Sequence, residues 1–577
     1  MAMSAEQERI INAPLAPMSV IACAGSGKTQ TAVSRIAQMR ILLGEDRGRV
    51  ALLSFSNVAV DTFRRRYRTL IQEVGVRCAS SRVEIDTLDG FITSNIIRPH
   101  AYRTMGASQT AFLVTGTEPF LAAFTFRPGT YPVSITKMQV GMRDGAVYFY
   151  YTNNDSKEEL NKTSSENLVH RLGKTGAYTH SLGRYWCYRT LADQPAILRA
   201  FSRRYRHILI DEAQDIGTLH QGIIEQLVGA GTQVSLIGDP NQCIYEFADA
   251  DGTFLKQYGQ RDGTTELGLT RNYRSVPSIL GLANQLALRT DTADRSAPET
   301  AHGAHFVAYK RAERQSLIKA FQAVVLAAGL KIGQSAVLCR GRDLAEALAG
   351  NREAPGQGSV QSFARAALLR DQGQDHLEAF KLVASCVVSL LANPPRGLFA
   401  MLTQPVRYPD ARHIRRRLWA FTRDSDVGLP SASLRANSHW HPELLKRLKR
   451  LLGELQTHHG LQSANNLGNK LAKKGLLDIP LADTGDLDAD ADARIRIDTV
   501  HQVKGESLDA VLYITTKEHA AALLAGVDSE VGRIGYVAIT RARDLLWLAV
   551  PANSLAELKP ALVTRGFQQR DVALSQS

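Results

Sequence analysis

The sequence lacks paired cysteines, long apolar runs and low-complexity tracts. Its six cysteines lie far apart, and no two of them form a C-x-x-C pair. This spacing argues against a zinc or iron–sulfur site and predicts reduced thiols. The first residues show no secretory signal pattern, and no apolar run is long enough to cross a membrane. We therefore expect a cytoplasmic protein without a membrane partner.

Acidic residues are fewer than basic ones. The 577 residues include 69 lysines and arginines against 56 aspartates and glutamates, which gives a net charge of +13. The length is enough for three or four domains. The surplus of positive charge favours a polyanionic partner, although it is equally consistent with solubility alone.

The stretch IACAGSGKT, at residues 21–29, joins a short apolar run to a helical pattern that starts near Thr31. A strand, a glycine-rich loop and a helix in this order are the context of a phosphate-binding P-loop. In such a loop Lys28 places a charge at the β- and γ-phosphates, and the Thr29 hydroxyl holds Mg²⁺. Ala22 stands where the usual motif has its first glycine, and a plain strand-to-helix turn is the alternative interpretation. The loop residues expected to surround the phosphates are Ala24, Gly25, Ser26, Gly27, Lys28 and Thr29.

Two adjacent acids end another apolar run, in HILIDEAQD at residues 207–215. Asp211, at the carboxyl end of the expected strand, is suited to hold Mg²⁺ through water. Glu212 beside it is suited to polarise an attacking water molecule. Adjacent acids often only begin a turn or a helix, but the P-loop upstream favours the catalytic interpretation.

Four polar or aromatic side chains are suited to a nucleotide held by this P-loop. Gln242 and Arg274, in the loops after later strands, are candidates to contact the γ-phosphate. Tyr273 is suited to stack on adenine. Gln7, upstream of the P-loop, carries an amide that matches the donor and acceptor of an adenine edge, although an exposed position on the first helix is the simpler interpretation.

Aromatic residues at strand ends suggest contacts with single-stranded nucleic acid. The apolar run at residues 50–57 ends in Phe55 and Asn57, and the helix after it carries four arginines. We expect Phe55 to stack on a base while the arginines hold phosphates. A merely solvated basic face is the alternative. Phe247 is a second candidate for stacking.

These blocks, in this order, resemble those of the UvrD/Rep/PcrA-type superfamily 1 DNA helicases. The resemblance rests on GSGKT, IDEAQD, GDPNQCIY, RNYRS, TVHQVKGE and YVAITRAR. It implies an α/β fold with two RecA-like P-loop domains, each with a parallel sheet and a largely helical inserted subdomain. The expected segments are residues 1–95 and 201–270 for the first motor domain, 96–200 for its insertion, 271–349 and 491–577 for the second motor domain, and 350–490 for its insertion.

The resemblance also implies roles, with ATP and Mg²⁺ as cofactors. The residues that it assigns to adenine are Gln7 and Tyr273. Those that it assigns to the hydrolytic centre are Lys28, Thr29, Asp211 and Glu212. Those that it assigns to the γ-phosphate are Gln242, Arg274 and Arg541. Those expected along the DNA strand are Phe55, Asn57, Phe247 and His501.

Three positions depart from the family pattern. Glu506, expected at a ribose hydroxyl, stands one place earlier than the glutamate of the family's K-G-L-E-F. Asp89 replaces a usual histidine, and Phe247 replaces a common tryptophan. The segment 350–490 does not align with the family's usual second insertion.

The function implied is that of an ATP-dependent helicase or translocase that moves on single-stranded DNA in the 3′ to 5′ direction. The alternative is an ATPase subunit that senses DNA ends and regulates a partner nuclease, as in Gabija-type antiphage systems. No nuclease motif is visible in the chain, so cutting would require that partner.

Overall fold

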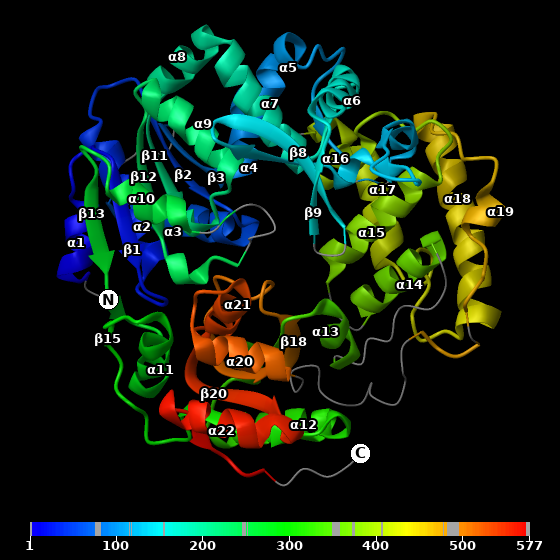
Figure 1. Cartoon of the computed structure of the whole chain (residues 1–577). Coiled ribbons are helices and arrows are strands. Elements are labelled where there is room, and N and C mark those ends of the chain that lie inside the picture. The colour runs from blue at the N-terminus through cyan, green and yellow to red at the C-terminus, as the bar shows by residue number, and fades with distance from the viewer. Residues whose placement is uncertain are drawn as a thin grey trace.

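The computed structural model describes residues 3–74, 82–114, 116, 118–153, 156–244, 250, 252–348, 358–371, 375–405, 408–476, 478–481 and 495–572. Two six-stranded sheets dominate this part of the chain, and every strand pair within them is parallel. Figure 1 shows the two sheets in separate bodies, with the N-terminal body above the C-terminal one. No helix in the described ranges is long and apolar enough to span a membrane.

The first sheet has the order β13-β1-β12-β11-β2-β3. Its central strands are almost wholly buried because helices cover both faces, as parallel sheets require. Its strands are β1 (Met18–Ala22), β2 (Arg49–Ser54), β3 (Val83–Thr87), β11 (Tyr205–Asp211), β12 (Gln233–Gly238) and β13 (Thr265–Leu269). Its helices are α1 (Ala5–Ile11), α2 (Lys28–Leu42), α3 (Asn57–Val74), α9 (Thr218–Gly229) and α10 (Thr253–Gly259).

The second sheet has the order β18-β17-β19-β20-β16-β21. Its strands are β16 (Gly303–Tyr309), β17 (Ala336–Cys339), β18 (Arg496–Thr499), β19 (Leu508–Ile514), β20 (Ala542–Pro551) and β21 (Gln568–Gln569). Its helices are α11 (Pro277–Ala287), α12 (Arg314–Ala327), α20 (Lys517–Ala525), α21 (Glu530–Ile539) and α22 (Leu555–Thr564). The predicted α/β fold with two parallel-sheet domains is confirmed.

The chain between β3 and β11 adds both helices and strands to the first body. Its Phe91 packs edge to face against Tyr205 of β11, so its core is continuous with that of the first sheet. Its helices are α4 (Leu88–Ile92), α5 (Arg98–Thr104), α6 (Lys162–Lys174), α7 (His180–Asp193) and α8 (Pro195–Arg204). Its antiparallel sheet consists of β7 (Gln139–Arg143), β8 (Ala146–Asn153) and β9 (Ser156–Leu160).

The described chain between β17 and β18 is mostly helical and has a core of its own. Leucines at helical spacing in the longest helix, among them Leu444, Leu448 and Leu455, are completely buried in this core. The helices are α13 (Arg342–Leu348), α14 (Gly358–Asp371), α15 (His376–Ser389), α16 (Leu398–Thr403), α17 (Arg412–Arg423), α18 (His441–His459) and α19 (Leu467–Lys470). Figure 1 places this helical body beside both sheets.

Candidate active site

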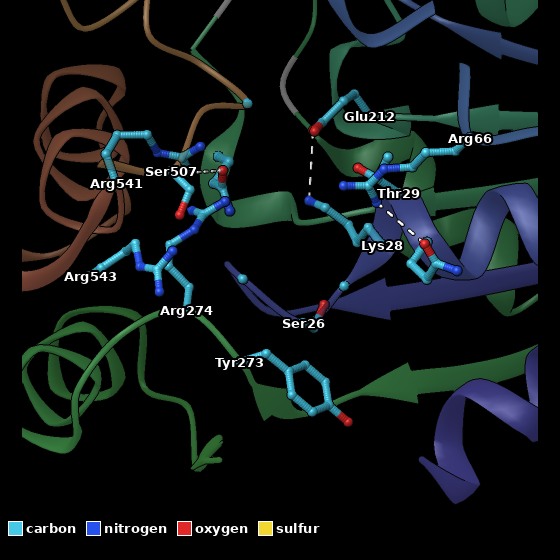
Figure 2. Close-up of a pocket in the computed structure, with 15 residues that line it drawn as sticks. Ser26, Lys28, Thr29, Arg66, Glu212, Tyr273, Arg274, Ser507, Arg541 and Arg543 are labelled. Carbon is cyan, nitrogen blue, oxygen red and sulfur yellow. Dashed lines mark hydrogen bonds and ion pairs between the residues drawn. The ribbon is translucent and has the colours of Figure 1, made fainter. Parts of the chain in front are cut away.

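A pocket lies between the two sheets, with the P-loop on one wall and arginines of the second body on the other (Figure 2). The residues that line it are Gly25, Ser26, Gly27, Lys28, Thr29, Gln30, Arg66, Glu212, Gln242, Tyr273, Arg274, Gly505, Ser507, Arg541 and Arg543. The structure therefore brings together residues that are more than 500 positions apart in the sequence.

The P-loop wall is shaped by two glycines in the left-handed region. Gly25 has a φ of 74° and Gly27 has a φ of 78°, conformations that other residues adopt only with strain. A Cβ atom on Gly25 would also lie 2.6 Å from Cβ of Arg274, so only glycine permits this approach. Gly27 turns the chain directly into α2, which begins at Lys28, earlier than the pattern near Thr31 predicted. The helix N-terminus thus faces the pocket and favours an anion there.

Lys28 and Glu212 face each other across the pocket floor. Nζ of Lys28 lies 3.7 Å from Oε2 of Glu212, and Nε2 of Gln214 donates to the same oxygen at 2.5 Å. Burial by itself raises the pKa of Glu212, but the charges of Lys28 and Lys504 outweigh this and lower the pKa. Glu212 is therefore an ionised carboxylate, the form that can accept a proton from water. Its φ of 55° is unusual for a residue with a side chain and points to a functional constraint.

Asp211 is buried beneath Glu212 at the end of β11. Burial, together with the charge of Glu212, raises the pKa of Asp211. Its Oδ1 is buried and accepts no hydrogen bond from any described residue. An unsatisfied carboxylate oxygen on the P-loop side fits an Mg²⁺ site, because hard cations prefer oxygen ligands. Thr29, the other predicted ligand, lines the pocket.

The opposite wall presents a cluster of arginines. Arg541 is almost completely buried, and its Nη2 donates to Oε1 of Gln242 at 2.6 Å. Nη1 of Arg274 donates to the carbonyl oxygen of Thr540 at 2.8 Å. Burial, together with the neighbouring charge of Arg541, lowers the pKa of Arg274 to about 9. Like charges held together in this way create a site for an anion.

Of the two residues predicted to hold adenine, one lines the pocket and the other does not. Tyr273 lines the pocket. Gln7 is buried against the P-loop, where its Nε2 lies 3.4 Å from the carbonyl oxygen of Ser26. Its Oε1 accepts from the backbone N–H of Ser4 in the capping box of α1. Gln7 is not among the residues that line the pocket.

Glu506 and Ala24 also lie outside the pocket lining. The Glu506 carboxylate pairs with Arg496, with a distance of 2.6 Å from its Oε2 to Nη2. Ser507, the next residue, lines the pocket instead. The Ala24 carbonyl oxygen accepts from Nδ2 of Asn272 at 2.6 Å, which links the P-loop to the chain that leads into the second body.

The pocket contains two arginines to which the sequence had not assigned a nucleotide contact. Arg66 projects from α3, whose arginines the sequence had suggested for DNA phosphates. Arg543 follows Arg541 by two residues, at the start of β20. No signal in the sequence distinguishes Arg66 from its neighbours, because which face of α3 meets the pocket depends on how the helix packs.

Two of the predicted DNA contacts, Phe55 and Asn57, follow the carboxyl end of β2, whereas His501 follows β18 in the second body. Phe55 is half-buried, and its ring meets that of His220 edge to face, with 5.6 Å between centroids. Asn57 is exposed at the start of α3. Nε2 of His501 lies 3.2 Å from the carbonyl oxygen of Ile244 in the first body. Phe247 lies outside the described residues.

Asp89, the residue that departs from the family pattern, is the centre of an ionic cluster. Arg184 from α7 donates to both of its carboxylate oxygens, at 3.0 and 2.8 Å, and Nε2 of His220 lies 3.0 Å away. Burial by itself raises the pKa of Asp89, but Arg184, His180 and His220 hold it well below its usual value. The carboxylate therefore joins α7 to His220 of α9, whose ring meets that of Phe55.

A buried ion pair joins the two bodies near the pocket. Nζ of Lys504 donates to both carboxylate oxygens of Asp215, at 2.7 and 2.6 Å. Burial raises the pKa of Asp215 to about 6, although Lys504 opposes the rise. Separation of the bodies would break this pair, so the contact belongs to the arrangement in which the pocket is closed.

Comparison with known proteins gives matches over both bodies. Residues 3–127 and 130–261 match the UvrD/REP helicase N-terminal domain, and residues 409–553 match the UvrD-like helicase C-terminal domain. The chain is 26% identical over 314 residues to the ATP-dependent DNA helicase UvrD2 of Mycobacterium tuberculosis, covering 49% of this chain and 42% of that protein. It is 24% identical over 304 residues to DNA helicase II of Haemophilus influenzae, covering 49% and 40% respectively. The matches thus span about two fifths of the length of these relatives.

Proposed function

The chain belongs to the UvrD/Rep family of superfamily 1 helicases, and on this premise we propose that it hydrolyses ATP to move along single-stranded DNA. The observation that carries the proposal is the shared pocket, in which the P-loop of one sheet faces arginines attached to the other. A nucleotide in this position contacts both bodies at once. Its hydrolysis therefore changes how they are held together.

The hydrolytic step follows from the charges around the pocket. Lys28 and the start of α2 hold the phosphates, and Glu212 accepts a proton from the attacking water. Mg²⁺, held by Thr29 and Asp211, would neutralise charge on the phosphates. Arg274 and Arg541 stabilise the charge that develops on the γ-phosphoryl group. Since both arginines belong to the far wall, loss of that group removes the attraction between the walls.

Movement requires that the two bodies bind the DNA strand in turn as the pocket opens and closes. Phe55 belongs to the first body, while His501 belongs to the second and reaches the first at Ile244. When the walls approach or separate, these contacts shift relative to each other along the strand. We propose a 3′ to 5′ direction on the basis of the family, with cytoplasmic DNA as the partner.

The test is ATPase activity with and without single-stranded DNA, followed by strand displacement on duplexes with a 3′ or a 5′ tail. We expect DNA-stimulated hydrolysis and displacement from the 3′-tailed duplex only. Lys28→Ala should abolish both, whereas Lys256→Ala, which removes an exposed lysine of α10, should abolish neither. Near-normal hydrolysis by Lys28→Ala would show that the nucleotide site is wrongly placed.

The same assay distinguishes the alternative function from the proposed one. An ATPase that senses DNA ends and regulates a partner nuclease would be stimulated by DNA ends and would displace little or no strand. The antiphage role would then require a nuclease whose activity changes with the nucleotide bound here. Displacement from tailed duplexes by the isolated chain contradicts this alternative.

A further inference from the structure

We propose that Arg543 is a further nucleotide-contacting residue, which exchanges its ion pair with Asp509 for a phosphate when the triphosphate enters. The inference deepens the proposed function, because it takes a nucleoside triphosphate as the ligand of the pocket. It adds a third arginine to the wall formed by Arg274 and Arg541, and it makes Asp509 a competitor of the nucleotide for that arginine.

The position of Arg543 is the first support. It is the second residue of β20, and its side chain lines the pocket. Figure 2 shows it entering from the same side as Arg541 and Arg274. All three come from the second body, so any phosphate that they share is bound opposite the P-loop.

The second support is that Arg543 is loosely held. Its Nε lies 3.6 Å from Oδ1 of Asp509, beyond hydrogen-bond distance, and this buried nitrogen donates to no described residue. Arg295 nearby, in contrast, makes short hydrogen bonds of the kind expected for a structural arginine. It donates to Oδ1 of Asp544 at 2.6 Å and to the carbonyl oxygen of Arg274 at 2.7 Å. A guanidinium with unmet donors at a pocket wall is available to a phosphate.

The charge balance of the pocket is the third support. Its lining includes five cations, at Lys28, Arg66, Arg274, Arg541 and Arg543, and one carboxylate, at Glu212. The charge of Arg543 also contributes to the lowered pKa of Arg274, after burial and the charge of Arg541. The arginines therefore repel one another until an anion lies among them. A triphosphate relieves this repulsion, and a diphosphate, which lacks the group nearest the arginines, relieves it less.

A purely structural role for the pair makes different predictions. Asp509 is in β19 and Arg543 is in β20, and these neighbouring strands pair with each other. If the ion pair only joined the strands, removing either partner would reduce stability and would leave nucleotide affinity unchanged. Competition instead predicts effects of opposite sign, because loss of Asp509 frees Arg543 for the nucleotide.

The test compares Arg543→Gln, Arg543→Lys, Asp509→Asn and the double variant with the wild-type chain. Arg311→Gln, which removes an exposed arginine of the same body, is the control. Binding of ADP and of a non-hydrolysable ATP analogue is measured beside KM, kcat and melting temperature. We expect Arg543→Gln to weaken binding of the ATP analogue about 10-fold, the usual size for one charge-assisted hydrogen bond. ADP binding should change less, and Arg543→Lys should recover part of the loss.

Asp509→Asn should tighten binding of the ATP analogue, and it should have no such effect when Arg543 is already Gln. Unchanged analogue binding by a stable Arg543→Gln variant overturns the inference, as does weaker binding by Asp509→Asn. Failure of the proposed function is distinguishable from these results. In that case the wild-type chain itself would not bind or hydrolyse ATP, and Lys28→Ala would behave like the wild type.

Discussion

Arg541 donates from Nη2 to Oε1 of Gln242 at 2.6 Å, and this hydrogen bond joins the two sheets across the nucleotide pocket. Gln242 in turn donates to Oδ2 of Asp239 at 2.6 Å, at the end of β12. The far-wall arginine is thus held by the strand end beside the P-loop. Both residues line the pocket, where the proposed function expects the γ-phosphate.

Arg541→Ala should reduce the rate of ATP hydrolysis by about 10³-fold, because the charge that forms on the transferred group loses its partner. The measurement is single-turnover hydrolysis at saturating ATP. Arg541 is buried, so its truncation also leaves a hole, and Arg541→Lys is the control that keeps the stem and the charge. If a well-folded Arg541→Lys variant loses as much rate as Arg541→Ala does, the result supports a bidentate contact between the guanidinium and the phosphate. If both variants hydrolyse ATP near the wild-type rate, the assignment of Arg541 to the γ-phosphate is wrong.

Glu212→Gln should preserve nucleotide binding and slow turnover by about 10²–10⁴-fold, since the amide cannot accept a proton from water. Binding of a fluorescent ATP analogue and steady-state hydrolysis separate the two effects. Glu225→Gln, in a solvent-exposed ion pair with Arg261, is the matched control and should leave both unchanged. Equal losses of affinity and rate would indicate a defect in the fold or the metal site.

Phe55→Ala should weaken binding to single-stranded DNA by about 1–3 kcal/mol if the ring stacks on a base. DNA-stimulated hydrolysis should fall, while the rate without DNA should stay the same. Phe55 also packs against the core of the first body, so melting temperature must be measured beside the two rates. Phe55→Leu preserves apolar packing without an aromatic face. If it binds DNA as well as the wild type does, the stacking assignment is wrong.

Asp89→Asn should lower the free energy of unfolding at pH 7 by about 1–3 kcal/mol, because Arg184 loses its charged partner. The pKa of Asp89 is depressed in the folded state, so its contribution is fully present above the unfolded pKa of about 3.9. It is lost as the pH falls through the folded pKa. The difference between variant and wild type should therefore shrink below about pH 4 in denaturant titrations. Asp61→Asn, in an exposed pair, is the control, and a pH-independent difference would contradict the mechanism.

The sequence by itself determined the parts of the site that depend on neighbours along the chain. A strand, a tight turn and a helix follow one another at Gly25–Lys28, so the P-loop is recognisable before any packing is known. The acids after the apolar run of β11 are equally local, since a buried parallel strand presents its next residues at the sheet edge. The α/β class with two parallel sheets followed from the order of such runs.

The tertiary structure alone decided which side chains face the pocket beyond those that the motifs had indicated. Glu506 and Ser507 are adjacent, yet the carboxylate of Glu506 pairs with Arg496 while Ser507 lines the pocket. Arg66 reaches the pocket because of the face that α3 presents, and Asp89 meets Arg184 because α7 packs against α4. These contacts depend on packing between segments far apart in sequence. Local motifs therefore specify the P-loop and the acids after β11, while packing between distant segments decides that Arg66, Arg543 and Ser507 line the pocket and that Asp89 meets Arg184.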